Sequence, residues 1–105
     1  MIKKLIQRVF ERFGLILLPK WKINKILPII RMKRIISKYE IDCAIDVGAN
    51  IGQYRNFLRD EVGYKGLIIS FEPDPENIKH LKKISLNDKN WIIQECALGS
   101  TNTTL

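Results

Sequence analysis

The stretch that decides the fold of this chain is Cys43-Ala44-Ile45-Asp46-Val47-Gly48-Ala49-Asn50-Ile51-Gly52-Gln53, and Glu72 follows twenty residues after Gly52. The apolar residues at its start predict a β-strand, its glycines predict a tight turn, and a helical pattern follows. The next apolar run, Ile68-Ile69-Ser70-Phe71-Glu72-Pro73, ends on a carboxylate. A strand, a glycine turn, a helix and an acidic strand end are, in this order, typical of α/β folds that bind a nucleoside cofactor at the edge of a parallel sheet.

The composition is that of a single globular domain with an uneven charge distribution. The chain has 105 residues, of which 46% are hydrophobic and 28% are charged. Residues 1–40 carry eleven Lys and Arg against two acidic residues, a net charge of +9, whereas residues 41–105 carry seven basic and nine acidic residues, a net charge of −2. We therefore divide the chain into a basic helical segment, residues 1–40, and an α/β segment, residues 41–105.

Residues 2–13 predict a basic amphipathic helix, because apolar residues recur at helical spacing and polar or charged residues occupy the other positions. Two interpretations are open. The helix is either an accessory helix that covers one face of the domain, which we favour, or a peripheral membrane contact in which residues 2–18 lie on an anionic surface. Charges interrupt every window of membrane-spanning length and argue against a cleaved signal peptide. Basic residues without interleaved aromatic residues argue against a nucleic-acid partner.

Local signals predict the remaining elements. Pro28 is expected to open a second helix, because proline suits the first turn. A strand over residues 43–47 leads into a helix over residues 53–62, which ends at Gly63. A second strand, residues 66–71, precedes a helix that begins at Asp74-Pro75-Glu76, and a third strand covers residues 91–97. The helix over residues 53–62 is expected to bury Tyr54, Phe57, Leu58 and Val62.

The turn after the first strand supplies the candidate binding residues. Gly48 and Gly52 permit a sharp turn and the close approach of a ligand, and the helix that follows offers unpaired N–H groups to an anionic group. Asp46 is placed to orient the turn or to reach a ligand ammonium group, and Glu72 is placed to accept the hydroxyls of a ribose. The dinucleotide pattern G-x-G-x-x-G is not met, because Asn50 stands at its second glycine, and no P-loop Gly-Lys-Ser/Thr follows. The alternative is a purely structural turn, with Asn50 in a left-handed conformation.

Cysteine and histidine usage predicts no metal site. His80 is the single histidine, and we expect it on the solvated surface of a helix. Cys43 and Cys96 lie in apolar runs, and we expect both to be small buried side chains in a reducing, cytoplasmic compartment.

Three blocks together resemble a known family. Asp46-Val47-Gly48-Ala49-Asn50-Ile51-Gly52, Phe71-Glu72-Pro73 and Ala97-Leu98-Gly99 resemble the FkbM-type S-adenosylmethionine-dependent methyltransferases, over about residues 41–105. The resemblance implies a Rossmann-like sheet, S-adenosyl-L-methionine as cofactor, and O-methyl transfer to a sugar, glycan or other small-molecule hydroxyl. It also implies that Asp46, Gly48, Asn50 and Gly52 surround the methionine part of the cofactor, that Glu72 holds the ribose, and that Pro73 lies near the adenine. It assigns no catalytic residue.

The family's later blocks have no counterpart here, so we expect only the first three strands of the Rossmann-like sheet and a chain that is inactive alone. In a sheet of order 3-2-1-4-5 the first strand is central, so Ile45 and Val47 are expected to lie on an unpaired apolar edge. Two other functions stay open. One is a non-catalytic module that binds a membrane or a partner through its basic helix. The other is a nicotinamide-dependent oxidoreductase, which the missing middle glycine disfavours.

Overall fold

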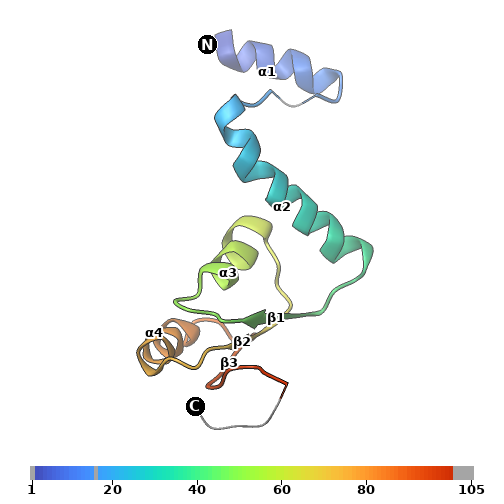
Figure 1. The fold of residues 1–105 in the computed structure, drawn as a ribbon. Helices are drawn as coiled ribbons and strands as arrows, with labels where there is room; N and C mark the ends of the chain where they lie inside the picture. Colours follow the sequence, from blue (N-terminus) through green and yellow to red (C-terminus); the bar gives the residue numbers. More distant parts are fainter. Residues whose placement is uncertain (1, 16, 101–105) are drawn as a thin grey trace.

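Three parallel strands form a sheet in the C-terminal part of the molecule (Figure 1). The computed structural model describes residues 2–15 and 17–100. Strands β1 (Cys43–Val47), β2 (Leu67–Phe71) and β3 (Trp91–Gln94) lie in the order β1-β2-β3, and both neighbouring pairs are parallel. The mixed α/β class and the parallel order of the first three strands are therefore confirmed, and both are consistent with part of a Rossmann-like fold.

Each pair of strands is connected by a helix. The first connection contains α3 (Gln53–Asn56), which continues directly as the π-helix η1 (Phe57–Val62), and Gly63 ends it with a left-handed φ of 79°. The second contains α4 (Pro75–Ser85), whose N-cap Asp74 accepts a hydrogen bond of 3.0 Å from the backbone N–H of Glu76. Capping by Asp74 with proline at the first helical position is the predicted arrangement.

The hydrophobic core lies on one face of the sheet. Ala44, Ile68 and Trp91 are paired across the three strands and share this face, which packs against Leu58 of η1 and Leu81 of α4. Because both crossovers run in the same direction along the sheet, right-handed connections place their helices on the same side. The core therefore has two layers, strands on one side and helices on the other.

The opposite face of the sheet is apolar but contains no fully buried residue. Ile45 is 63% exposed and Val47, also on the free edge of β1, is 60% exposed, as the sequence predicted. The register places them on the same face as Leu67, Ile69, Phe71 and Ile92. An exposed apolar face next to an unpaired strand edge is a site for association or aggregation.

Two helices precede the sheet. Helix α2 (Lys20–Lys38) lies between α1 (Ile2–Arg12) and the sheet, and the molecule measures 60 × 28 × 25 Å along its principal axes (Figure 1). The C-terminal half of α2 contributes Ile29, Met32 and Ile36 to the periphery of the core. No residue of α1 is buried. Among residues 2–15 and 17–100, no helix is long and apolar enough to cross a lipid bilayer.

The expected helix start at Pro28 is wrong. Pro28 lies inside α2, which begins eight residues earlier, after Pro19. Proline in a helix interior removes one backbone hydrogen bond and costs about 3 kcal/mol. The apolar side chains of the second half of α2, which pack against the core, offset that cost.

The expected burial of both cysteines is also wrong, since the thiols of Cys43 and Cys96 are exposed. Cys43 points to the uncovered face of the sheet, opposite Ala44. Cys96 lies beyond the end of β3, which stops at Gln94 and not at Ala97 as expected. Apolar neighbours in the sequence do not bury a side chain when only one face of the strand is covered.

A polar cluster links α3 and η1 to the loop before β3. The guanidinium of Arg59 donates from Nε to Asp88 Oδ2 at 2.9 Å, and Arg55 donates to the same oxygen from Nε at 3.0 Å and from Nη2 at 2.9 Å. Arg59 also donates to three backbone carbonyl oxygens, those of Tyr64, Gly66 and Asn90. Burial raises the pKa of Asp88, but the hydrogen bonds from Arg59 and Arg55 outweigh it and hold the pKa below its ordinary value.

Candidate cofactor site at the carboxyl end of the sheet

A hollow of about 470 Å³ lies where β1 ends and α3 begins. Its lining comes from the end of the strand, the glycine turn and the first turns of the helix. The residues are Asp46, Gly48, Ala49, Asn50, Gln53, Tyr54 and Phe57. Ligands of open α/β sheets bind in this position, outside the carboxyl ends of the strands.

The turn contains three residues with left-handed backbone conformations, at which φ is 76° for Gly48, 55° for Asn50 and 92° for Gly52. A Cβ at Gly48 would have no atom within 4 Å, so this glycine borders open space at the hollow. A Cβ at Gly52 would lie 3.3 Å from Ile84 Cδ1, because Gly52 faces α4. The two glycines therefore have different roles. Gly48 leaves room for a ligand, and Gly52 allows the turn to pack closely on the core.

Asp46 is a buried carboxylate at the hollow, with 8% of its surface exposed. It lies opposite Ser70 in the register of β1 and β2, and Ser70 Oγ donates a hydrogen bond of 3.2 Å to Asp46 Oδ2. Trp91 Nε1 in turn donates to Ser70 Oγ at 2.9 Å. Burial raises the pKa of Asp46, and the hydrogen bond from Ser70 lowers it by less. A buried anion with spare acceptor positions is suited to binding a ligand cation.

Glu72 connects the two loops at this end of the sheet. Its Oε1 accepts a hydrogen bond of 2.7 Å from the backbone N–H of Asn50, and its Oε2 accepts one of 3.0 Å from that of Asp74. The hydrogen bond from Asp74 is the main cause that lowers the pKa of Glu72, against the effect of burial, and the bond from Asn50 adds to it. Glu72 does not line the hollow and is 5% exposed. Each carboxylate oxygen retains an acceptor position, and the carboxylate holds Asn50 in place at the hollow.

A family model described as the methyltransferase FkbM domain matches residues 46–105 of the chain. The chain belongs to the FkbM methyltransferase domain family. Comparison with curated proteins and with solved structures yields no match. The matched region of the FkbM domain begins at Asp46 and includes the glycine turn, Glu72 and β3, whereas α1 and α2 lie outside it.

The FkbM domain brings only part of the predicted cofactor set together. Asp46, Gly48 and Asn50 line one hollow, and Glu72 is joined to them through the backbone of Asn50. Gly52 faces the core. Pro73 borders a separate hollow of about 480 Å³, together with Pro75, Ile78, Lys79, Lys82 and Glu95. The assignment of all six residues to the cofactor stays a prediction, and the positions of Gly52 and Pro73 do not add support to it.

Two residues of the FkbM hollow were expected in the core. Tyr54 is 42% exposed and its ring centroid lies 5.9 Å from that of Phe57, so the two aromatic rings form one wall of the hollow. Phe57 is partly buried and packs against the core as expected, whereas Tyr54 is exposed. Helical spacing alone does not distinguish a core residue from one at the rim of a site. Gln53 was not singled out, although its side chain accepts a hydrogen bond of 3.2 Å from the backbone N–H of Ile51 within the turn. The described residues contain no group of three or more His, Cys, Asp or Glu that could hold a metal ion.

The lowered pKa values of Glu72 and Asp88 predict that the FkbM domain loses stability in acid. A carboxylate whose pKa is lower in the folded state contributes stability above its unfolded pKa, and this is lost as the pH falls through the folded pKa. We expect the free energy of unfolding to fall below about pH 4, by up to about 1.4 kcal/mol per pH unit for each proton taken up. The raised pKa of Asp46 acts in the opposite direction and reduces the slope.

Urea denaturation at a series of pH values measures this slope. Glu72→Gln should flatten it, because the substituted side chain no longer titrates. Glu61→Gln is the matched control, since Glu61 is an exposed glutamate on η1, and it should leave the slope unchanged. A Glu72→Gln protein with the wild-type slope would contradict the contribution of Glu72 to the pH dependence of stability.

Proposed function

We propose that the chain binds S-adenosyl-L-methionine in the hollow beside Asp46 and belongs to a methyltransferase that acts on a hydroxyl group of a sugar, glycan or other small molecule. The observation that carries this proposal is the FkbM family match, which begins at the residue that supplies the buried carboxylate of the hollow. The family match supports the methyltransferase class. The resemblance of the three sequence blocks to the family supports a hydroxyl group as the acceptor.

The residues of the hollow fit the methionine part of this cofactor. The carboxylate of Asp46 complements the α-ammonium group, and Gly48 leaves open space where any other residue would place a Cβ. The helix that starts after Gly52 has no side-chain cap, so its first N–H groups are available to a carboxylate. Tyr54 and Phe57 provide an apolar wall. When bound, S-adenosylmethionine supplies an electrophilic methyl group on a sulfonium.

Glu72 has two roles in this proposal. It holds the backbone of Asn50 at the hollow, and its role in binding the ribose hydroxyls rests on the resemblance of Phe71-Glu72-Pro73 to the family. For the acceptor hydroxyl the chain provides orientation, since bringing the reacting atoms together in line supplies a large share of the acceleration of a transfer reaction. We assign no general base among the described residues, so cofactor binding is a sharper test than turnover.

Isothermal titration of the full chain with S-adenosylhomocysteine tests the proposal, with NAD⁺ as the comparison ligand. We expect binding in the micromolar range, a free energy of about −8 kcal/mol, and no heat from NAD⁺. NAD⁺ binding equal to that of S-adenosylhomocysteine would favour the oxidoreductase alternative. A folded chain that binds neither ligand would overturn the assignment of the hollow.

A further inference from the structure

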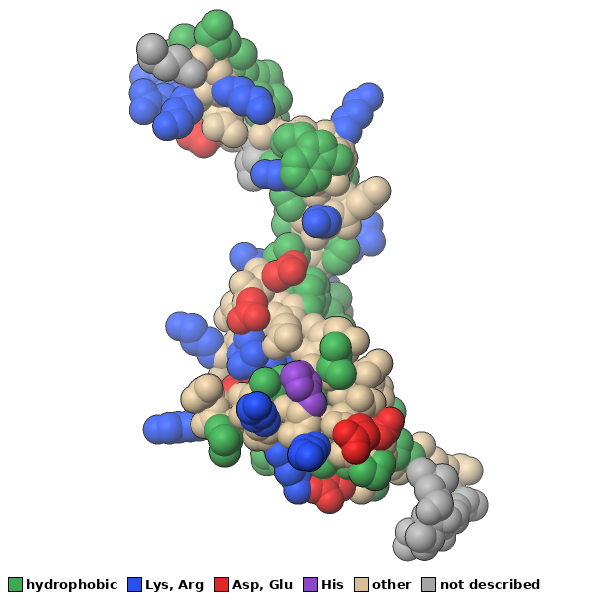
Figure 2. Space-filling model, turned by 90° about the vertical axis from the view of Figure 1, so that its left-hand side faces the viewer, with side chains coloured by type: hydrophobic (Ala, Val, Ile, Leu, Met, Phe, Trp, Pro, Cys, Tyr) green, Lys and Arg blue, Asp and Glu red, His purple; other side chains and the backbone are tan. Residues whose placement is uncertain are grey.

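Helix α1 presents an apolar face that no other described part of the chain covers. Its apolar side chains range from 36% exposed at Phe10 to 76% at Ile2. They follow helical spacing, so they form one continuous stripe: Ile2, Leu5, Ile6, Val9 and Phe10. Figure 2 shows hydrophobic side chains gathered at this end of the molecule, next to a cluster of Lys and Arg. Contiguous exposed apolar side chains are typical of surfaces that contact another molecule or a membrane.

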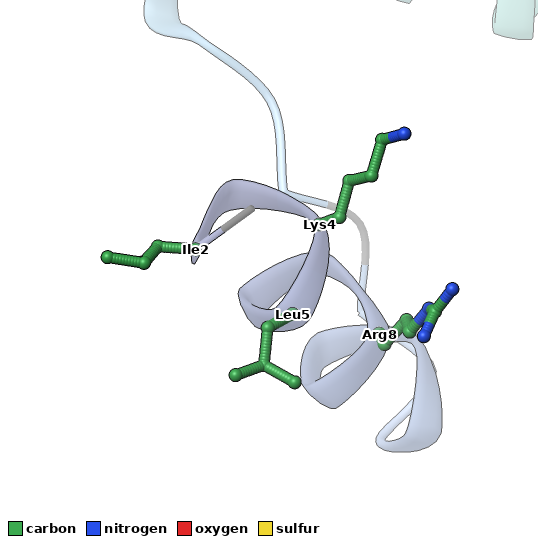
Figure 3. A pocket seen from close by; sticks show the side chains of 4 residues that line it. All are labelled: Ile2, Lys4, Leu5 and Arg8. Atoms are coloured by element: carbon green, nitrogen blue, oxygen red, sulfur yellow. The ribbon is translucent and has the colours of Figure 1, made fainter.

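The rest of the α1 surface is cationic. The helix carries Lys3, Lys4, Arg8 and Arg12 against a single acidic residue, Glu11. Figure 3 shows Ile2 and Leu5 projecting in directions different from those of Lys4 and Arg8. At helical spacing, Lys3 and Arg12 border the apolar stripe on its two sides. Lys and Arg side chains are long, so those that border an apolar stripe can extend their charged ends to anionic groups while the stripe contacts an apolar surface.

The segment after α1 also exposes apolar side chains next to a basic one. Phe13, Leu15 and Leu17 are exposed between the two helices, and Trp21 is exposed at the start of α2. Lys22 Nζ lies 5.3 Å from the centroid of the Trp21 ring. Tryptophan beside lysine is typical of side chains at the boundary between lipid tails and headgroups.

We propose that α1, together with Phe13, Leu15, Leu17 and Trp21, docks the protein on an anionic lipid surface, with α1 in the plane of the interface. Charge complementarity favours lipid over a second copy of this chain, because two copies joined through α1 would bring two cationic helices together. The helix spans about 16 Å, about half the hydrocarbon thickness of a bilayer, so it lies on the membrane and does not cross it. This inference does not depend on the cofactor or the acceptor.

Co-sedimentation with vesicles tests the proposal on the full chain. We expect binding to phosphatidylcholine vesicles that contain phosphatidylserine, weaker binding to pure phosphatidylcholine, and release at high salt. The emission of Trp21 should shift to shorter wavelength with the anionic vesicles, since Trp91, the other tryptophan, is already buried. Absence of binding to the anionic vesicles would overturn the proposal.

Two pairs of matched variants separate α1 from the rest of the molecule. Leu5→Glu with Val9→Glu should abolish binding, whereas Leu86→Glu, at an 82% exposed leucine after α4, should not. Lys3→Gln with Lys4→Gln should weaken binding about fivefold per residue, whereas Lys83→Gln with Lys89→Gln should have little effect. Because α1 has no buried residue, its variants leave the core intact.

Binding that survives in the Leu5→Glu, Val9→Glu protein would assign the vesicle contact to the bare face of the sheet and overturn the proposal. Self-association that this variant abolishes, without vesicle binding by the wild type, would assign α1 to a second copy instead.

Discussion

Replacing Arg59 with methionine should remove a large share of the free energy of unfolding. The guanidinium makes five hydrogen bonds and its side chain is 11% exposed. Methionine has a similar length but leaves Asp88 with only Arg55 and the backbone N–H of Asn90, and it removes the donor of three carbonyl oxygens. Breaking a buried ion pair in this way costs about 3–5 kcal/mol. A domain of this size has a total stability of about 5–15 kcal/mol.

Urea denaturation followed by circular dichroism measures this loss. Arg55→Met is the matched control, because Arg55 contacts the same carboxylate but is more exposed and bonds to no backbone carbonyl. We expect it to cost about 1–2 kcal/mol, because Asp88 keeps its hydrogen bonds from Arg59 after the substitution. Arg59→Lys should fall between the two, since an ammonium cannot reproduce the planar fork. An Arg59→Met protein whose free energy of unfolding lies within about 1 kcal/mol of the wild-type value would contradict the structural role of the Arg55–Arg59–Asp88 cluster.

Asp46→Asn should weaken the binding of S-adenosylhomocysteine about tenfold to a hundredfold. The amide has nearly the shape of the carboxylate but no charge, so the hydrogen bond to the ligand ammonium loses its ionic part, worth about 1.5–3 kcal/mol. The asparagine oxygen still accepts the hydrogen bond from Ser70. Removing a buried charge also relieves its desolvation, so we expect the stability of the folded chain to be unchanged or increased.

Titration calorimetry of three proteins decides this prediction. Asp42→Asn is the matched control, because Asp42 is an exposed aspartate immediately before β1, at the opposite end of the strand. It should bind like the wild type. If Asp46→Asn also binds like the wild type, the carboxylate does not contact the ligand, and the proposed orientation of the methionine part is wrong.

Local signals in the sequence were enough to predict the elements that surround the site. The strand before Gly48, the helix that ends at Gly63 and the start of α4 after Asp74 each depend on residues close together in the chain. The position of Asp46 at the end of a strand was sufficient to place it near the turn. Signals between residues that are close in the sequence therefore account for the order of the elements and for the approximate position of the hollow.

Contacts between distant residues account for what could not be predicted. Gly48 and Gly52 have the same local signal, and only the approach of Ile84 to Gly52 tells them apart. Pro28 has the local signal of a helix start, yet the packing of α2 on the core continues the helix through it. The Ser70 contact to Asp46 depends on the register between β1 and β2, which the sequence pattern alone does not define.

The hydrogen bond from the Trp91 indole to Ser70 makes this side chain an internal reporter of the site. The indole N–H is two hydrogen bonds from the carboxylate of Asp46 and is itself buried in the core. A change of charge at Asp46, by protonation or by a bound cation, alters the polarisation of Ser70 and therefore of this N–H. Its nuclear magnetic resonance signal follows the state of the hollow without an introduced label, and the exposed indole of Trp21 provides the reference signal in the same spectrum.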